Sequence, residues 1–173
     1  AFSTENWKRD QEEVSGLMGL FRKAFQKNVE DLHKKGVRLN MIGDPGKFPS
    51  DIQKDMAKWI ELSKENTKVT VSFALNYGGR DEILRAMHKA TTANVDLSKI
   101  TEEEFSQCMD TKDIPDPDLI IRPGGEQRLS GYLPWQSVYS ELYFTDILMP
   151  DFDKHALKKA VEEYASRQRR FGK

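Results

Sequence analysis

Leu-Ile-Ile-Arg-Pro-Gly-Gly-Glu-Gln-Arg-Leu-Ser, residues 119–130, is the stretch that best indicates how this 173-residue chain folds and where it binds. Its apolar start predicts a buried strand that stops at Arg122, before a Pro-Gly-Gly turn. Glycines let the backbone bend sharply and expose its N–H groups, while arginines such as Arg122 and Arg128 bind phosphate oxygens bidentately. Open α/β sheets place their ligands where strands end. The loop is therefore either a phosphate site or an ordinary tight turn with two solvated arginines.

Composition restricts the class of protein. The length corresponds to a single domain, residues 1–173, that can bury a sizeable core. A net charge of −1, with charged residues at 32%, gives no reason to expect nucleic acid or bulk attraction to anionic lipid. The single Cys108 excludes an internal disulfide, and no apolar run approaches the roughly 20 residues that span a bilayer. These features predict a soluble cytoplasmic protein.

Helical and strand patterns alternate along the chain. Strands are expected over 37–42, 68–75, 118–121 and 142–144, and helices over 10–35 (ended by Gly36), 50–60 (capped by Ser50), 81–93, 101–109 (opened by a Thr101 capping box) and 153–170. In the helix over 81–93, the residues expected to face the core are Ile83, Leu84, Met87 and Ala90. The connections are long enough for crossovers, so the pattern predicts an α/β fold with a mostly parallel sheet flanked by helices.

Polar or glycine-rich turns follow four of the expected strands. They span 3–9, 43–44, 76–80 and 122–130. The carboxyl ends of parallel strands share one edge of a sheet, so these turns are expected to converge. The converging groups would be the guanidinium groups of Arg9, Arg80, Arg122 and Arg128, the amide of Asn6, and the hydroxyls of Ser3 and Ser130. Such a set suits a diphosphate better than a single carboxylate. Alternatively, each arginine caps its own strand end and meets solvent.

Two further features bear on ligands. Glu141 is a lone carboxylate in the aromatic segment 139–144, where it needs a partner. Mg²⁺ bridging to a phosphate and a salt bridge to an arginine are equally compatible with the sequence. Phe21 and Phe25, with the strand over 69–75, supply apolar surface that forms either the core or the wall of a channel for a hydrophobic tail.

Five motifs occur together in this order along the chain. They are Ala-Phe-Ser-Thr-Glu-Asn-Trp at 1–7, Asn-Tyr-Gly-Gly-Arg at 76–80, the loop from Ile121 to Trp135, Tyr-Ser-Glu-Leu-Tyr-Phe-Thr at 139–145, and Arg-Arg-Phe-Gly at 169–172. Read together, they closely resemble the cis-prenyltransferases, with the bacterial undecaprenyl diphosphate synthases as the best match. The resemblance extends over the whole chain, and several of the motifs are long and specific.

The resemblance implies an enzyme that condenses isopentenyl diphosphate onto farnesyl diphosphate with Mg²⁺. The new double bonds are cis, and the long-chain product is the lipid-carrier precursor for cell-wall synthesis. A homodimer is implied as well, with possible peripheral membrane contact when product leaves. On the matching positions, Asn6 would assist proton removal and Glu141 would bind Mg²⁺. The substrate-binding positions would be Ser3, Thr4, Glu5, Trp7, Arg9, Arg122, Arg128, Leu129, Ser130, Arg170 and Gly172. Glu13 would lie in a helix beside the hydrophobic tunnel, and Val69 where tunnel depth is set.

This sequence departs from the family's pattern in the arginine loop. Pro123 stands where Thr is common, and Gly131 where Asn is usual. Proline removes a hydroxyl and an N–H and biases Arg122 toward extended geometry, so altered phosphate contacts are expected there. Gln127 occupies a position that is His in some relatives.

A larger departure concerns the family's first strand and its Asp-Gly-Asn-Gly-Arg-Trp loop, which would precede Ala1. The sequence therefore leads to the expectation that the N-terminal portion is missing, and that the intact protein is a synthase while this chain alone is inactive. Two other interpretations stay open at this point. One is a non-catalytic partner subunit of a prenyltransferase, and the other is a generic phosphate-binding α/β module.

Overall fold

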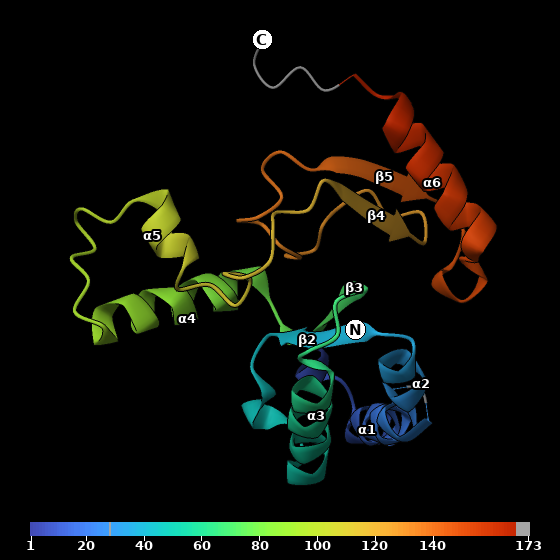
Figure 1. The fold of residues 1–173 in the computed structure, drawn as a ribbon, viewed down its shortest axis with the longest axis horizontal. Coiled ribbons are helices and arrows are strands. Elements are labelled where there is room, and N and C mark those ends of the chain that lie inside the picture. Colours follow the sequence, from blue (N-terminus) through green and yellow to red (C-terminus); the bar gives the residue numbers. More distant parts are fainter. Residues whose placement is uncertain (28, 169–173) are drawn as a thin grey trace. The chain divides into compact units, whose positions relative to one another are not determined.

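The computed structural model describes residues 1–27 and 29–168. They form two compact units, Ala1–Lys112 and the part that begins at Asp113 (Figure 1). Each unit has its own parallel strands and is described by itself below.

The first unit is built on three parallel strands. They are β1 (Phe2–Ser3), β2 (Val37–Ile42) and β3 (Val69–Tyr77), in the order β1-β3-β2. β2 and β3 pair without interruption from Val37–Val69 to Ile42–Ala74. The predicted parallel arrangement is confirmed here, and β3 extends two residues beyond its predicted end.

Helices α1 (Gln11–Lys27), α2 (Val29–Lys34) and α3 (Ser50–Ser63) pack on one face of this sheet (Figure 1). The core between them is apolar and rich in aromatic rings. Its central buried members are Phe2, Met18, Phe48, Ile52, Met56 and Leu75. Phe2 contacts Trp7 and Phe48 at ring-centroid distances of 4.7 and 5.6 Å. Edge-on and tilted ring contacts of this kind add to the free energy gained from burying apolar surface.

The helix expected over 10–35 corresponds to α1 and α2, which lie on either side of residue 28, a position outside the described ranges. One detail of the helix predicted over 50–60 was wrong. Ser50 does not cap α3, because Pro49 stands at the N-cap and Ser50 is already the first helical residue. Proline is well tolerated at a helix start, where its missing N–H has no partner to lose. As predicted, α2 ends just before Gly36, which has a φ of 79°.

α4 (Gly79–Thr92) and α5 (Glu102–Ser106) complete the helices of the first unit. The capping box at Thr101 is confirmed, with its hydroxyl accepting from the Glu104 N–H. The predicted core face of α4 was right for Ala90 and wrong for two of its other members. Leu84 and Met87 are exposed, whereas Glu82 is buried along with Ala86 and Ala90.

The second unit contains β4 (Leu119–Pro123), β5 (Glu141–Thr145) and α6 (Lys154–Ser166). β4 and β5 are parallel and pair in register from Leu119–Glu141 to Pro123–Thr145. Asp153 caps α6 by accepting from the N–H groups of His155 and Ala156, each at 2.9 Å. The described residues also contain three 3₁₀ turns. η1 (Asn6–Lys8) and η2 (Pro45–Lys47) belong to the first unit, and η3 (Met149–Asp151) belongs to the second. Within the described ranges no helix combines the length and the apolar character needed to cross a bilayer.

Candidate active site

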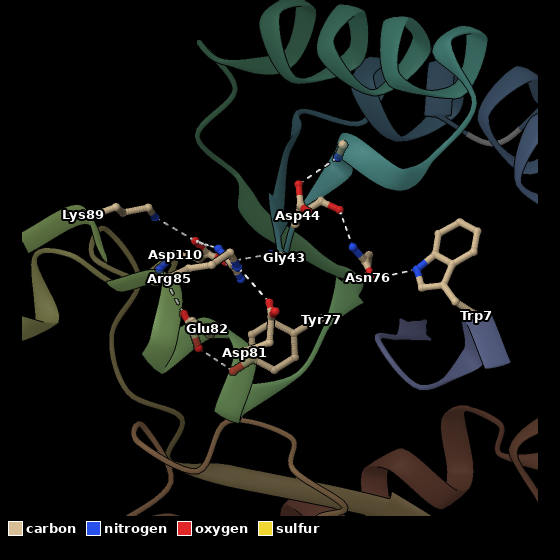
Figure 2. A network of polar contacts seen from close by, with 11 residues as sticks. Trp7, Gly43, Asp44, Asn76, Tyr77, Asp81, Glu82, Arg85, Lys89 and Asp110 are labelled. Atoms are coloured by element: carbon tan, nitrogen blue, oxygen red, sulfur yellow. Dashed lines mark hydrogen bonds and ion pairs between the residues drawn. The ribbon is translucent and has the colours of Figure 1, made fainter. Parts of the chain in front are cut away.

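The segments that follow β1, β2 and β3 meet at the carboxyl edge of the first unit's sheet, around Asn76 (Figure 2). The indole Nε1–H of Trp7 donates to Asn76 Oδ1 at 2.7 Å. The Asn76 amide in turn donates through Nδ2 to the carbonyl oxygen of Asp44 at 2.8 Å. The side chain of Asn76, in β3, thus connects the segments that follow β1 and β2. The ends of these three strands meet as predicted. Arg9 and Arg80 are exposed, and the gathering of the four arginines stays a prediction.

Glycine is required where these segments approach one another. Gly43 has a φ of 110°, and a Cβ there would lie 2.1 Å from the carbonyl oxygen of Leu75. Any side chain at Gly43 would therefore both strain the backbone and collide with β3. A Cβ at Gly78 would lie 2.6 Å from Thr4 Oγ1, so that glycine lets β1 and β3 end side by side.

The segment after β1 carries the residue expected to assist catalysis. Asn6 begins η1, and its Oδ1 accepts from the Ser3 N–H at 2.6 Å. The Thr4 N–H donates to the Tyr77 carbonyl oxygen at 3.1 Å, which anchors the segment to β3. Arg9 and Glu5 are exposed, and Arg9 forms an ion pair with Glu13 in α1. Asn6 and Trp7 are therefore held in place, while the Arg9 guanidinium lies at the surface.

A network of carboxylates that the sequence did not predict connects the end of β2 to α4 (Figure 2). Asp110 accepts from the Gly43 N–H at 3.0 Å, from Arg85 Nη1 and Nη2 at 2.8 and 2.7 Å, and from Lys89 Nζ at 3.0 Å. Burial acts to raise the pKa of Asp110, but the hydrogen bonds from Arg85 and Lys89 outweigh it and lower the pKa below its ordinary value. The same ion pair raises the pKa of Arg85.

Buried Glu82 completes the network. Its carboxylate accepts from the Tyr77 hydroxyl at 2.6 Å and from the Asp110 N–H at 3.0 Å. These donors account for the burial of a charged residue on α4. No local pattern in the sequence distinguishes Glu82 or Asp110 from surface acids, since their partners lie 5 to 67 residues away.

The arginine loop lies in the second unit, at the carboxyl end of β4. Arg122 donates through Nη1 to the carbonyl oxygen of Arg128 and, at 3.1 Å, to Ser130 Oγ. The three residues expected to hold one diphosphate are therefore neighbours in space. Arg128 is exposed and forms an ion pair with Glu126. Leu129, which lies between Arg128 and Ser130 in the sequence, is half-buried.

The glycines of this loop do not present free N–H groups, contrary to the sequence-based expectation. Gly124 donates to the Ile147 carbonyl oxygen and Gly125 to the Thr145 carbonyl oxygen, each at 2.9 Å. Both have positive φ, 97° and 78°, so they form the turn, and their amides attach it to the end of β5. Anion binding at this loop would rest on guanidinium and hydroxyl groups.

Glu141 has the salt bridge that the sequence left open. Its Oε2 lies 2.8 Å from Arg167 Nη1, and Arg167 also contacts the Leu142 carbonyl oxygen at 3.0 Å and Glu163 at 2.8 Å. Among residues 1–27 and 29–168, no three His, Cys, Asp or Glu side chains group as a metal site would require. A metal role for Glu141 stays a prediction.

Two of the predicted site residues, Arg170 and Gly172, lie outside the described residues. The remaining ones fall into two sets. Ser3, Thr4, Glu5, Asn6, Trp7 and Arg9 belong to the first unit, and Arg122, Arg128, Leu129, Ser130 and Glu141 to the second. In the second set, Arg122, Arg128 and Ser130 lie together, whereas Glu141 begins β5 opposite Leu119, three residues before Arg122 along the pairing. The meeting of the two sets stays a prediction.

Phe21 and Phe25 of α1 pack against the core of the first unit. Phe25, Met56, Trp59 and Phe73 line a small apolar cavity of about 20 Å³ in the first unit, between α1, α3 and the sheet. Phe21 packs nearby, with its ring centroid 5.9 Å from that of Phe48. A role for this region as a channel wall stays a prediction.

Parallel strands with polar turns at their carboxyl ends place the chain among α/β proteins that bind ligands at that edge. Comparison with known proteins makes the class specific. The chain belongs to the cis-prenyltransferase family, because the family model described as putative undecaprenyl diphosphate synthase matches residues 1–172.

Curated relatives agree with that membership. The chain is 47% identical over 176 residues to an isoprenyl transferase of Clostridium tetani, with 99% of this chain and 69% of the relative covered. It is 49% identical over 173 residues to an isoprenyl transferase of Neisseria meningitidis, with 100% and 69% covered. Both relatives are named as enzymes that transfer prenyl groups.

Solved structures share the fold. A probable undecaprenyl diphosphate synthase from Campylobacter jejuni superposes with a TM-score of 0.90 at 35% identity, covering 100% of this chain and 81% of that one. Lavandulyl diphosphate synthase from Lavandula x intermedia, solved in complex with dimethylallyl diphosphate, gives 0.93 at 33% identity, with 100% and 77% covered.

Proposed function

We propose that this protein condenses isopentenyl diphosphate onto an allylic diphosphate, farnesyl diphosphate, to make a long-chain polyprenyl diphosphate with cis double bonds. Undecaprenyl diphosphate, the lipid-carrier precursor for cell-wall synthesis, is the proposed product. The observation that carries the proposal is the arrangement of Arg122 with Arg128 and Ser130 at the end of β4. The bound dimethylallyl diphosphate of the lavender relative supports an allylic diphosphate as the second substrate.

The arginine loop would bind the diphosphate of isopentenyl diphosphate. A guanidinium group carries five N–H donors, and Arg122 uses Nη1 to hold the loop, so its other donors can face phosphate oxygens. Arg128 would exchange its exposed partner Glu126 for the diphosphate, at small cost because the existing pair is solvated. Held this way, the substrate's double bond is positioned for attack on the allylic carbon.

Asn6 and Trp7 would act at the reacting carbons rather than at the diphosphate. A carboxamide does not titrate near neutral pH, so Asn6 would orient the carbon that loses its proton, or a water beside it. Its Oδ1 already accepts from Ser3, which fixes the plane of the amide. Trp7, Ser3, Thr4, Glu5 and Arg9 are proposed to contact substrate around it.

Glu141 is proposed as a ligand for Mg²⁺. A carboxylate oxygen suits this hard cation, and Mg²⁺ would neutralise charge on the departing diphosphate. The carboxylate is half-buried and lies beside an aromatic strand, so it is already partly desolvated. Binding a cation there requires Arg167 to move away, for which Glu163 provides a second acceptor.

We propose a homodimer and a brief contact with the membrane when product leaves. The exposed apolar side chains of Val138 and Tyr139, just before β5, are the kind of surface that an interface buries. Arg170 and Gly172 are proposed to contribute to substrate binding in the partner subunit. We also propose that both units belong to one catalytic domain.

Incorporation of labelled isopentenyl diphosphate tests the function. With the product of the complete gene, incorporation is expected to require both farnesyl diphosphate and Mg²⁺, and chromatography of the chains gives their length. Arg122→Lys loses the planar fork and is expected to raise the KM for isopentenyl diphosphate by about tenfold or more, one charged hydrogen bond contributing about 1.5–3 kcal/mol.

Arg38→Lys provides the matched control, since Arg38 is an exposed arginine on β2 outside the proposed site. It is expected to leave KM unchanged. Absence of any incorporation by an intact, folded protein with either farnesyl or dimethylallyl diphosphate would refute the proposal. Equal effects of the two arginine variants would refute the role of Arg122.

A further inference from the structure

Asn76 occupies an unusual position at the centre of the first unit's polar edge. Its side chain is only 1% exposed, and its backbone has a φ of 47°, in the left-handed region. Most residues other than glycine avoid that region, and asparagine tolerates it better than most. Both arms of its carboxamide are used, one by the Trp7 indole and the other by the Asp44 carbonyl. The residue is therefore specified by its backbone and by both ends of its side chain.

We propose that Asn76 is a positioning residue, which fixes the orientation of the Trp7 ring and through it the Asn6 amide. This inference rests on the proposed function, in which Asn6 orients the reacting carbon. Asn76 itself is not proposed to touch substrate.

Only a carboxamide supplies what this position needs. Trp7 Nε1–H is a donor and requires an acceptor, and the Asp44 carbonyl oxygen is an acceptor and requires a donor. Asparagine offers one of each on a single planar group. Aspartate at residue 76 would keep the acceptor for Trp7 but place a carboxylate against the Asp44 carbonyl. Glycine at residue 76 would suit the backbone conformation but would supply neither the acceptor nor the donor.

The hydrogen bond to Asn76 adds a directional polar constraint on the indole to the packing around it. Phe2 and Phe48 contact the Trp7 ring at centroid distances of 4.7 and 5.3 Å, and such apolar contacts have no directional polar requirement. The bond from Nε1 at 2.7 Å selects one edge of the ring. Figure 2 shows that edge directed at Asn76.

Asn6 inherits this constraint because it directly precedes Trp7 in the three-residue turn η1. The turn is held from one side by Ser3, which donates to Asn6 Oδ1, and from the other by the Trp7 indole on Asn76. Release of the indole removes one of these two side-chain hydrogen bonds. The amide plane of Asn6 is then expected to sample more than one orientation, while the diphosphate loops stay as they are.

The kinetic test is a double-mutant cycle with Asn76→Gly and Trp7→Phe in the product of the complete gene. Each single variant is expected to lower kcat by about tenfold, corresponding to about 1.4 kcal/mol, while the KM for isopentenyl diphosphate stays within about threefold. Because both variants remove the same hydrogen bond, the one between Trp7 and Asn76, the double variant is expected to be no slower than the slower single one.

Asn94→Gly is the matched control. Asn94 also has a positive φ, 58°, but it is exposed and lies in the turn after α4. It is expected to retain wild-type kcat, which separates relief of backbone strain from loss of the two side-chain hydrogen bonds. Asn76→Asp is expected to lose less kcat than Asn76→Gly, since it keeps the acceptor for Trp7.

A readout independent of turnover follows the Trp7 indole directly. The chain has three tryptophans, so the Nε1–H signal of Trp7 in a nitrogen–proton NMR spectrum is assigned as the one that Trp7→Phe removes. Its exchange with deuterated solvent is expected to accelerate by about tenfold or more in Asn76→Gly and to be unchanged in Asn94→Gly.

The outcomes separate this proposal from the proposed function. If kcat losses multiply in the double variant, or if indole exchange in Asn76→Gly equals that of the wild type, the positioning role is refuted. If the wild type incorporates no isopentenyl diphosphate yet the indole exchange behaves as expected, the proposed function fails while the structural coupling of Asn76 to Trp7 stands.

Discussion

Replacing Asp110 by asparagine is expected to destabilise the protein by about 2–3 kcal/mol at pH 7, because this carboxylate holds α4 to the end of β2. Its side chain is 10% exposed and that of Arg85 is 24% exposed, so solvent screens the pair only partly. Breaking a fully buried pair costs about 3–5 kcal/mol. Arg85 keeps a second partner in Asp81 at 2.8 Å, which places the loss toward the lower end.

The loss should depend on pH. The folded-state pKa of Asp110 is depressed, because the hydrogen bonds from Arg85 and Lys89 outweigh burial. Its stabilisation is therefore fully present above the unfolded pKa, near 3.9, and disappears as pH falls through the lower folded value. The neutral asparagine has no such dependence. The difference between the two proteins should stay constant from pH 7 down to about pH 4 and shrink at lower pH.

Urea unfolding followed by far-ultraviolet circular dichroism at pH 7, 5 and 3.5 measures this difference. Asp96→Asn is the control, since Asp96 is an exposed aspartate whose pKa is also lowered, chiefly by the hydrogen bond from the Ser98 side chain. It should leave the midpoint within error. A midpoint for Asp110→Asn equal to that of the wild type at pH 7 would show that the network contributes no net stability. A difference that is the same at pH 7 and 3.5 would contradict the lowered pKa of Asp110.

Two further predictions concern packing, and the same urea titration measures both. Ile52→Ala should cost about 3–4 kcal/mol, because Ile52 is 0% exposed, whereas Leu62→Ala on the exposed side of the same helix should cost far less; similar losses would contradict the assigned core. Gly78→Ala should cost about 1–3 kcal/mol through its contact with Thr4, and Thr4→Ala should relieve most of that loss; additive losses would contradict the close approach.

Local patterns predicted the elements of the fold well. β2 was expected over 37–42, and it spans those residues because its apolar alternation and the glycines on either side are local signals. The capping box at Thr101 was predicted for the same reason. β4 extends beyond its predicted end to Pro123 and β5 to Thr145, because their parallel pairing continues to those residues.

Partners far away in the sequence determine which side chains are buried at the polar edge, and local patterns do not predict them. Leu84 and Met87 were expected inside α4, yet Glu82 occupies the buried face because Tyr77 and Asp110 supply its donors. Likewise, the carboxamide of Asn76 meets Trp7 across 69 residues. Neither pairing is visible in helical or strand periodicity.

The arginine loop shows both outcomes at once. Its glycines were correctly placed in a tight turn, since both have positive φ. Their N–H groups, however, are bound by carbonyl oxygens of Thr145 and Ile147, and this depends on the parallel pairing of β4 with β5. The nearness of Arg122 to Ser130 follows from the turn itself and was predictable from spacing.

The pairing of β2 with β3 also limits where the chain can gain or lose residues. The register is fixed at one end by the Lys68 N–H on the Gly36 carbonyl at 3.1 Å, and at the other by Gly43 against Leu75. One inserted residue in β2 would turn every following side chain to the opposite face and move Gly43 from its place. The exposed turn at 96–99 has no such constraint. Insertions and deletions are therefore expected to be tolerated in turns of that kind and not in the strands that carry the polar edge.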